Sequence, residues 1–171
     1  MNRWLAICGL VGLGALGAAR GAETGAVPRI TAAMVSNQVA SVDGFVKDGR
    51  IEAYGDLLAA DLVVVARFAP GVVPGEGPAE EQMNREQYLE SLREMLEDAR
   101  ITAHTSNITK LEIGADGQQG TADMITFQQY KETGGAGQIS MAAEVKSTFV
   151  LRGGLLLITR LEFTVTHLVM K

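Results

Sequence analysis

The sequence contains a single cysteine, Cys8, among its 171 residues. A lone cysteine cannot form an intramolecular disulfide, so the fold depends on its buried core. Lysine and arginine number 15 against 20 acidic residues, a net charge of −5, and nucleic-acid binding needs the clustered positive charge that this balance disfavours. The two histidines, His104 and His167, have no second histidine close by in the sequence. We therefore expect no nucleic-acid partner, no metal site and no cofactor.

The first 22 residues have the pattern of a signal peptide. Met1-Asn2-Arg3 carries positive charge, and the apolar run from Trp4 to Leu16 has the length of a signal-peptide core. Small residues allow cleavage between Ala19 and Ala22, which would also remove Cys8. The apolar run is shorter than the ~20 residues that span a bilayer. We predict an exported protein, periplasmic or secreted, that has no membrane association after cleavage.

Apolar residues at every second position mark the C-terminal part of the chain as a hairpin. They include Met141, Val145 and Phe149 before a Gly153-Gly154 turn, and they resume after it. Upstream, helical spacing and a capping box that begins at Asn84 indicate three helices. The predicted helices span residues 30–47, 50–60 and 85–96. The predicted strands span residues 62–68, 101–113, 119–131, 138–152 and 155–168.

This order of elements predicts an α+β fold. Three N-terminal helices should pack on one face of a curved, mainly antiparallel sheet, which gives a cone-shaped α+β barrel. We assign residues 1–22 to the signal peptide, 23–30 to a flexible N-terminal segment and 31–171 to one domain. Residues 70–78 are rich in glycine and proline and should form a loop. The acidic residues that follow, Glu80, Glu81 and Glu86, should be solvated.

Four stretches within residues 31–168 match a known arrangement of packing motifs. They are 49–54, 60–64, 84–89 and 149–158. Together they resemble the helix-to-strand junction, the start of the third helix and the final hairpin of the nuclear transport factor 2-like superfamily. This superfamily includes SnoaL-like and ketosteroid-isomerase-like proteins. The resemblance implies the cone-shaped fold and a homodimer formed through the outer face of the sheet. It matches no catalytic motif residue by residue.

Strand parity predicts which side chains line the space between the helices and the sheet. If Ile125 and Phe127 face inward, so does Asp123, whereas His104 faces outward. A mostly apolar surface with a few polar groups is typical of a small-molecule pocket. The predicted ligand-binding residues are Tyr54, Thr105, Asn107, Asp123, Phe127, Ser147, Phe149, Thr159 and Phe163.

Three functions are compatible with this pattern. The one we favour is an exported domain that binds a small apolar molecule or a peptide in the pocket. An alternative is an isomerase, cyclase or hydrolase in which Asp123 acts with His167 as general acid and base, because burial would raise the pKa of Asp123. A further alternative is a dimeric structural or interaction module that uses the outer face of the sheet.

Overall fold

A computed structural model describes residues 28–72 and 80–171, and these ranges confirm the α+β class. The helices are α2 (Ala32–Lys47), α3 (Ile51–Gly55) and α4 (Arg85–Asp98). The strands are β1 (Leu58–Phe68), β2 (Glu80–Asn84), β3 (Ala99–Ile113), β4 (Gln119–Glu132), β5 (Gln138–Arg152) and β6 (Leu155–Met170). The predicted signal peptide lies outside the described residues. None of the helices within them has the length and hydrophobicity needed to span a bilayer.

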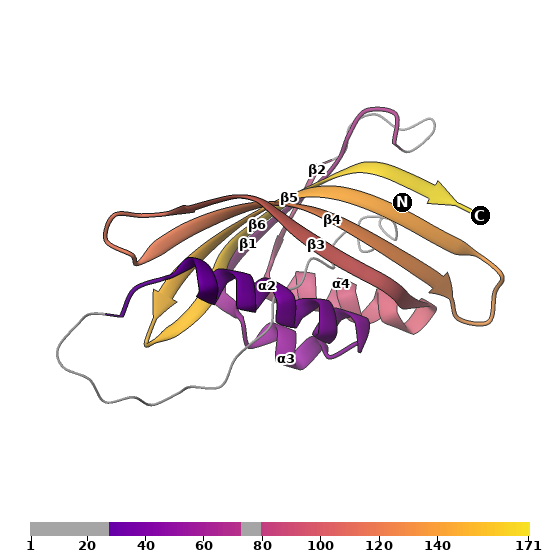
Figure 1. Ribbon diagram of the computed structural model, residues 1–171. Coiled ribbons are helices and arrows are strands. Elements are labelled where there is room, and N and C mark those ends of the chain that lie inside the picture. Colours follow the sequence, from indigo (N-terminus) through magenta and orange to yellow (C-terminus); the bar gives the residue numbers. More distant parts are fainter. Residues whose placement is uncertain (1–27, 73–79) are drawn as a thin grey trace.

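The strands form one curved sheet in the order β2-β1-β6-β5-β4-β3, and the three helices lie against its concave face (Figure 1). Neighbouring strands are antiparallel except for β1 and β6, which run parallel. A parallel pair needs a long crossover, and the chain between β1 and β6 supplies it. The large fully buried side chains between helices and sheet are Tyr54, Leu62, Tyr88, Leu92, Met124, Tyr130, Met141, Phe149, Ile158 and Phe163.

The helix ends follow the sequence signals. The Thr31 hydroxyl accepts a hydrogen bond from the Met34 backbone N–H at 3.2 Å and so caps α2. The predicted capping box of α4 is confirmed, since the Asn84 side chain accepts from the Gln87 N–H and the Gln87 side chain accepts from the Asn84 N–H. Helix α3 is shorter than expected, because Leu58 already pairs with Ile158 of β6. Pairing in the sheet overrides local helix propensity there.

Strand β2 was not expected from the sequence. Its residues 80–84 pair with β1, and Met83 is buried opposite Val64. Arg67 of β1 contacts Glu80 at 2.7 Å and Glu162 of β6 at 3.1 Å. The acidic stretch is therefore partly ordered by pairing with β1 and by this arginine, and β2 forms one edge of the sheet.

Bulges and pairing turn several strand residues away from their predicted faces. The register of β3 against β4 shifts between Ile101 and Ala103, which brings His104 inward. In β4 the even-numbered residues face the core, because Met124 pairs with Val145, a buried residue of β5. In β6 a further shift buries Ile158 in place of Leu157. The predicted inward or outward orientation of side chains was therefore wrong after the bulges in β3 and β6. It was also wrong along β4, which has apolar residues on both faces.

Candidate functional site

Five polar side chains form a continuous hydrogen-bonded chain on the inner face of β3 and β4. The Tyr130 hydroxyl donates to Gln128 Oε1, and Gln128 Nε2 lies 2.8 Å from His104 Nδ1. His104 Nε2 lies 3.3 Å from Ser106 Oγ, which is 3.2 Å from Thr126 Oγ1. Because the Gln128 amide nitrogen only donates, Nδ1 of His104 accepts and the ring proton sits on Nε2. Tyr130, Gln128 and His104 then each donate to the next group, and either hydroxyl of Ser106 and Thr126 can donate to the other.

Four of these side chains are almost completely removed from solvent, and Ser106 is half-buried. The exposed fractions are 8% for His104, 1% for Thr126, 0% for Gln128 and 1% for Tyr130. Each polar group that is buried without a hydrogen-bond partner costs roughly 1–3 kcal/mol in proteins. The mutual hydrogen bonds offset that cost, so the chain is a satisfied polar network within an otherwise apolar interior.

The polar chain lies near the end of the sheet where β6 ends. Gln128 pairs with Met141, and Met141 pairs with Leu168 near the end of β6. One row further on, Tyr130 is aligned through β5 with Met170, and Met170 is 55% exposed. This end of the sheet lies beside the C-terminus in Figure 1. The buried polar groups are thus one or two residue rows from solvent-exposed apolar surface.

A second buried polar contact joins α3 to α4. The hydroxyl oxygens of Tyr54 and Tyr88 are 3.0 Å apart, and their rings meet edge to face with centroids 6.1 Å apart. Burial, reinforced by the neighbouring Tyr88, raises the pKa of Tyr54 well above its usual value. Tyr54, which was predicted to bind ligand, packs between helices in this structure.

Three of the predicted pocket residues face the interior, and a fourth, Thr159, lies at a bulge. Ser147, Phe149 and Phe163 are buried on the inner face as expected, and their ligand-binding role stays a prediction. The Ser147 hydroxyl is buried with no hydrogen-bond partner among the described residues. Thr159 is half-buried at the bulge of β6, where its hydroxyl lies 3.5 Å from the Thr148 carbonyl oxygen.

The inward orientation predicted for four further residues is wrong. Thr105, Asn107 and Phe127 are exposed, and Asp123 is half-buried. Their strands are the ones whose parity was reversed, β3 by its bulge and β4 by its pairing with β5. All four residues therefore lie on the outer face of the sheet, away from the helices.

The predicted catalytic pair is not brought together. Asp123 is aligned with Lys146, whereas His167 is exposed and is aligned through Ala142 with Phe127. Asp123 and Phe127 are four residues apart on β4, which is about 13 Å along a strand. Asp123 and His167 are therefore too far apart to share a proton, and the proposed acid–base pair is wrong.

Sequence reasoning missed His104 and Gln128. One available signal was the alternation of Ala122, Met124 and Tyr130, which is as long as the competing Ile125 and Phe127 pattern. It puts Gln128 on the inner face. The bulge that brings His104 beside Gln128 has no comparable signal, because neither glycine nor proline occurs near Thr102.

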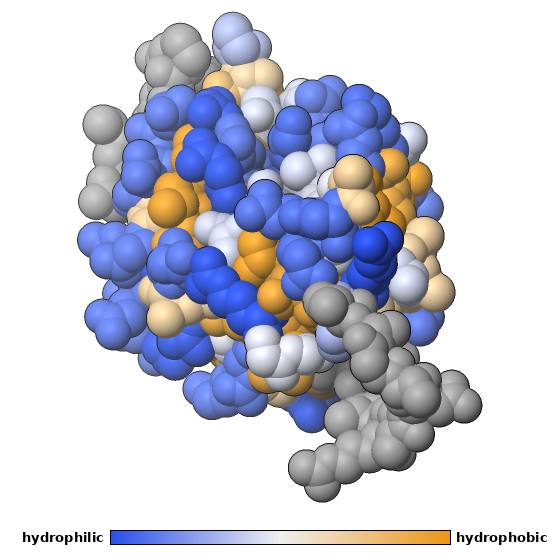
Figure 2. Space-filling model, turned by 90° about the vertical axis from the view of Figure 1, so that its left-hand side faces the viewer, coloured by the Kyte–Doolittle hydropathy of each residue, from blue (hydrophilic) through white to orange (hydrophobic). Residues whose placement is uncertain are grey.

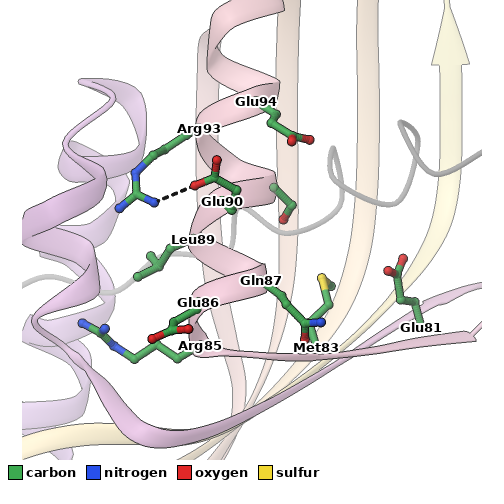
Figure 3. A pocket seen from close by; sticks show the side chains of 10 residues that line it. Glu81, Met83, Arg85, Glu86, Gln87, Leu89, Glu90, Arg93 and Glu94 are labelled. Carbon is green, nitrogen blue, oxygen red and sulfur yellow. Dashed lines mark hydrogen bonds and ion pairs between the residues drawn. The ribbon is translucent and has the colours of Figure 1, made fainter.

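A groove of about 650 Å³ lies between α4 and β2 (Figure 3). It is lined by Glu81, Met83, Arg85, Glu86, Gln87, Leu89, Glu90, Ser91, Arg93 and Glu94. None of the predicted ligand-binding residues is among them. Within residues 28–72 and 80–171, no three His, Cys, Asp or Glu side chains are grouped so that they could hold a metal ion.

Comparison with known proteins shows similarity in structure but not in sequence. The sequence matches no known family profile and no curated protein. A ketosteroid isomerase-like protein from Erwinia carotovora atroseptica has 11% identity and a TM-score of 0.54, over 71% of this chain and 85% of that one. A nuclear transport factor 2-like protein from Cytophaga hutchinsonii has 12% identity and a TM-score of 0.53, over 71% and 86%.

A third similar structure is that of a named enzyme. It is a hexachlorocyclohexane dehydrochlorinase, with 13% identity and a TM-score of 0.50, over 74% of this chain and 79% of that one. At these identities the likeness concerns the arrangement of helices and strands. That arrangement agrees with the one implied by the sequence motifs, and this chain has the nuclear transport factor 2-like fold.

Proposed function

We propose that this protein binds a small organic molecule on its concave face, next to the polar chain and near the end of β6. The observation that carries the proposal is the buried chain around His104 and Gln128, which ends at Tyr130, in the same residue row as the exposed Met170. Apolar side chains would fill a purely structural core at lower desolvation cost. A polar chain beside an exposed apolar end is what a ligand with one hydrogen-bonding group would use.

The chemistry of the site favours an uncharged ligand. The five linked side chains include no carboxylate, lysine or arginine. A charged ligand buried there would lose its hydration without gaining a counter-charge. The neighbouring Met141, Leu168 and Met170 offer flexible apolar contacts. We therefore expect an apolar molecule that carries a carbonyl or hydroxyl group.

A second candidate function is catalysis of a proton transfer, with His104 as the base. It is supported by the imidazole in the polar chain and by the names of similar structures, an isomerase-like protein and a dehydrochlorinase. Gln128 holds one ring nitrogen and Ser106 the other, so the ring orientation is fixed. A substrate would have to displace Gln128 from Nδ1, the ring nitrogen that carries no proton, before the imidazole could accept a proton there.

Export and dimer formation are parts of the same proposal. The N-terminal signal-peptide pattern supports export to the periplasm or the medium. Ile125 and Phe127 on the outer face of the sheet are 52% and 42% exposed, which supports a homodimer through that face. The side of the molecule seen in Figure 2 shows small hydrophobic patches separated by hydrophilic residues, so it is a poorer interface.

Thermal-shift screening of small uncharged molecules against the purified protein tests the proposal. A ligand that binds only the folded state raises the melting temperature, and the rise grows with the logarithm of its concentration above Kd. Gln128→Leu should weaken binding of a hit about tenfold or more, because it removes the centre of the polar chain. Gln129→Leu on the opposite face is the matched control. Equal binding by both variants would place the ligand elsewhere.

A further inference from the structure

Within the described ranges, the groove between α4 and β2 adjoins an edge of the sheet to which no further strand is paired. β2 is the terminal strand, and it is bonded on one side to β1. In an antiparallel pair the backbone N–H and C=O groups of alternate residues point away from the partner strand. The outer edge of β2 therefore carries backbone groups that can bind another strand.

The side chains of β2 show which face of such a strand would meet the groove. Glu81 and Met83 are aligned with the buried residues Ala66 and Val64, so they lie on the concave face. Figure 3 shows both side chains pointing from β2 toward the side of α4. Inward-facing side chains of an added strand would lie on the same face and would enter the groove.

The groove carries a net negative charge, because four glutamates and two arginines line it. Arg93 contacts Glu90 at 3.0 Å and Glu52 at 3.6 Å, and Arg85 donates to the Gly55 carbonyl oxygen at 2.9 Å. The remaining groove carboxylates make no ion pair within the described ranges. They are Glu81, Glu86 and Glu94. These charges are the wrong sign for nucleic acid or acidic peptides and complement lysine or arginine.

We propose that β2 and this groove bind an extended, basic segment of a partner protein, which adds to the sheet as a further strand. β2 has five residues, so a partner segment of similar length would pair along it. Backbone hydrogen bonds would supply affinity, and lysine or arginine at alternate positions facing Glu81 and Glu94 would supply selectivity. This interaction uses neither His104 nor Gln128 and does not depend on the ligand proposed above.

A fluorescent, capped peptide with lysine at alternate positions and threonine or valine between them tests the proposal by anisotropy. Two further versions carry N-methyl groups on alternate residues, one version for each edge of the extended peptide. We expect the first peptide to bind, one methylated version to bind about tenfold or more weakly, and the other to bind normally. Only one edge of the peptide can face β2, so the asymmetry between the two versions reports strand addition.

The charge requirement is tested with Glu81→Gln combined with Glu94→Gln. The matched control is Glu97→Gln combined with Glu144→Gln, two exposed residues outside the groove. The groove variant should bind the peptide about tenfold more weakly than the control variant. The proposal is overturned by absence of peptide binding, by equal loss in both double variants, or by methylated peptides that both bind normally. Circular dichroism of each variant establishes that it is folded.

Discussion

The hairpins β3–β4 and β5–β6 have the same architecture but opposite interiors. Both are long antiparallel pairs interrupted by register shifts. The inner face of β5–β6 is almost entirely apolar, with Met141, Ala143, Val145, Phe149, Ile158, Leu161, Phe163 and Val165 buried. The inner face of β3–β4 instead carries the polar chain centred on Gln128. One half of the concave surface is thus an apolar core, and the other half holds a buried, hydrogen-bonded polar network.

The largest expected effect comes from the apolar half. Phe163→Ala should lower the free energy of unfolding by about 3–5 kcal/mol, because Phe163 is fully buried and its loss leaves a cavity. Urea denaturation followed by circular dichroism measures the change. Leu155→Ala, at a position 62% exposed, is the control and should cost about 0.5 kcal/mol or less. Similar midpoints for the two variants would mean that β6 does not pack as described.

The polar half should respond less strongly to loss of one member. Gln128→Leu removes the amide that donates to His104 and accepts from Tyr130. We expect a loss of about 2 kcal/mol, since buried polar groups are deprived of a partner. Gln129→Leu makes the same chemical change on the outer face and should be close to neutral. A stable Gln128→Leu protein would show that the chain contributes nothing to folding and would sharpen its assignment to ligand binding.

The same contrast explains what could be predicted from the sequence. The face of β5 was predicted correctly because its apolar residues alternate with Ser140, Glu144 and Lys146, so one register is favoured. β4 has apolar residues on both faces, and only its pairing with β5 decides between them. The α+β class and the capping box at Asn84 depend on local signals and were predictable. The polar chain depends on a bulge in β3 and was not.

The short strand β2 was missed for a related reason. Its residues are mostly polar, and it becomes a strand because β1 offers an edge and Arg67 contacts Glu80. These are contacts between two separate segments of the chain, which local propensity does not encode. The candidate ligand site and the groove were thus both hidden from sequence reasoning, whereas the core that supports them was largely visible.

Unfolding at alkaline pH tests the buried contact between Tyr54 and Tyr88, which lies between α3 and α4 and outside both hairpins. The pKa of Tyr54 is raised in the folded protein by burial and by Tyr88, whereas a tyrosine in the unfolded chain ionises near its ordinary pKa of 10.0. The stabilisation is therefore complete below about pH 10 and is lost as pH rises above it, by about 1.4 kcal/mol per pH unit. Tyrosinate absorbance should show Tyr54 ionising only as the protein unfolds.

Tyr54→Phe is the control for this measurement. It removes the titrating hydroxyl but keeps the ring between α3 and α4, so stability should fall less steeply with rising pH than in the natural protein. If all three tyrosines ionise near their ordinary pKa while circular dichroism shows a folded protein, the buried position of Tyr54 is wrong.

The smallest effect, and the most direct test of the contrast, comes from two hydroxyls on neighbouring strands. Ser147 of β5 is fully buried without a hydrogen-bond partner among the described residues, whereas the Thr126 hydroxyl of β4 lies 3.2 Å from Ser106 Oγ. Ser147→Ala removes an unsatisfied polar atom and should leave stability unchanged or raise it by up to about 1 kcal/mol. Thr126→Val removes a satisfied hydroxyl and should cost about 1 kcal/mol.

The two substitutions change the free energy of unfolding in opposite directions only if the inner face of β5 is apolar and that of β4 is polar. Both substitutions delete one hydroxyl from a buried strand position, so backbone and solvent effects largely cancel in the comparison. Urea midpoints measured in parallel decide the matter. A destabilised Ser147→Ala protein would show that this hydroxyl has a bound partner such as an ordered water or a ligand atom. The polar surface of the interior would then extend from β4 onto β5, and the ligand site would be larger than the chain around His104.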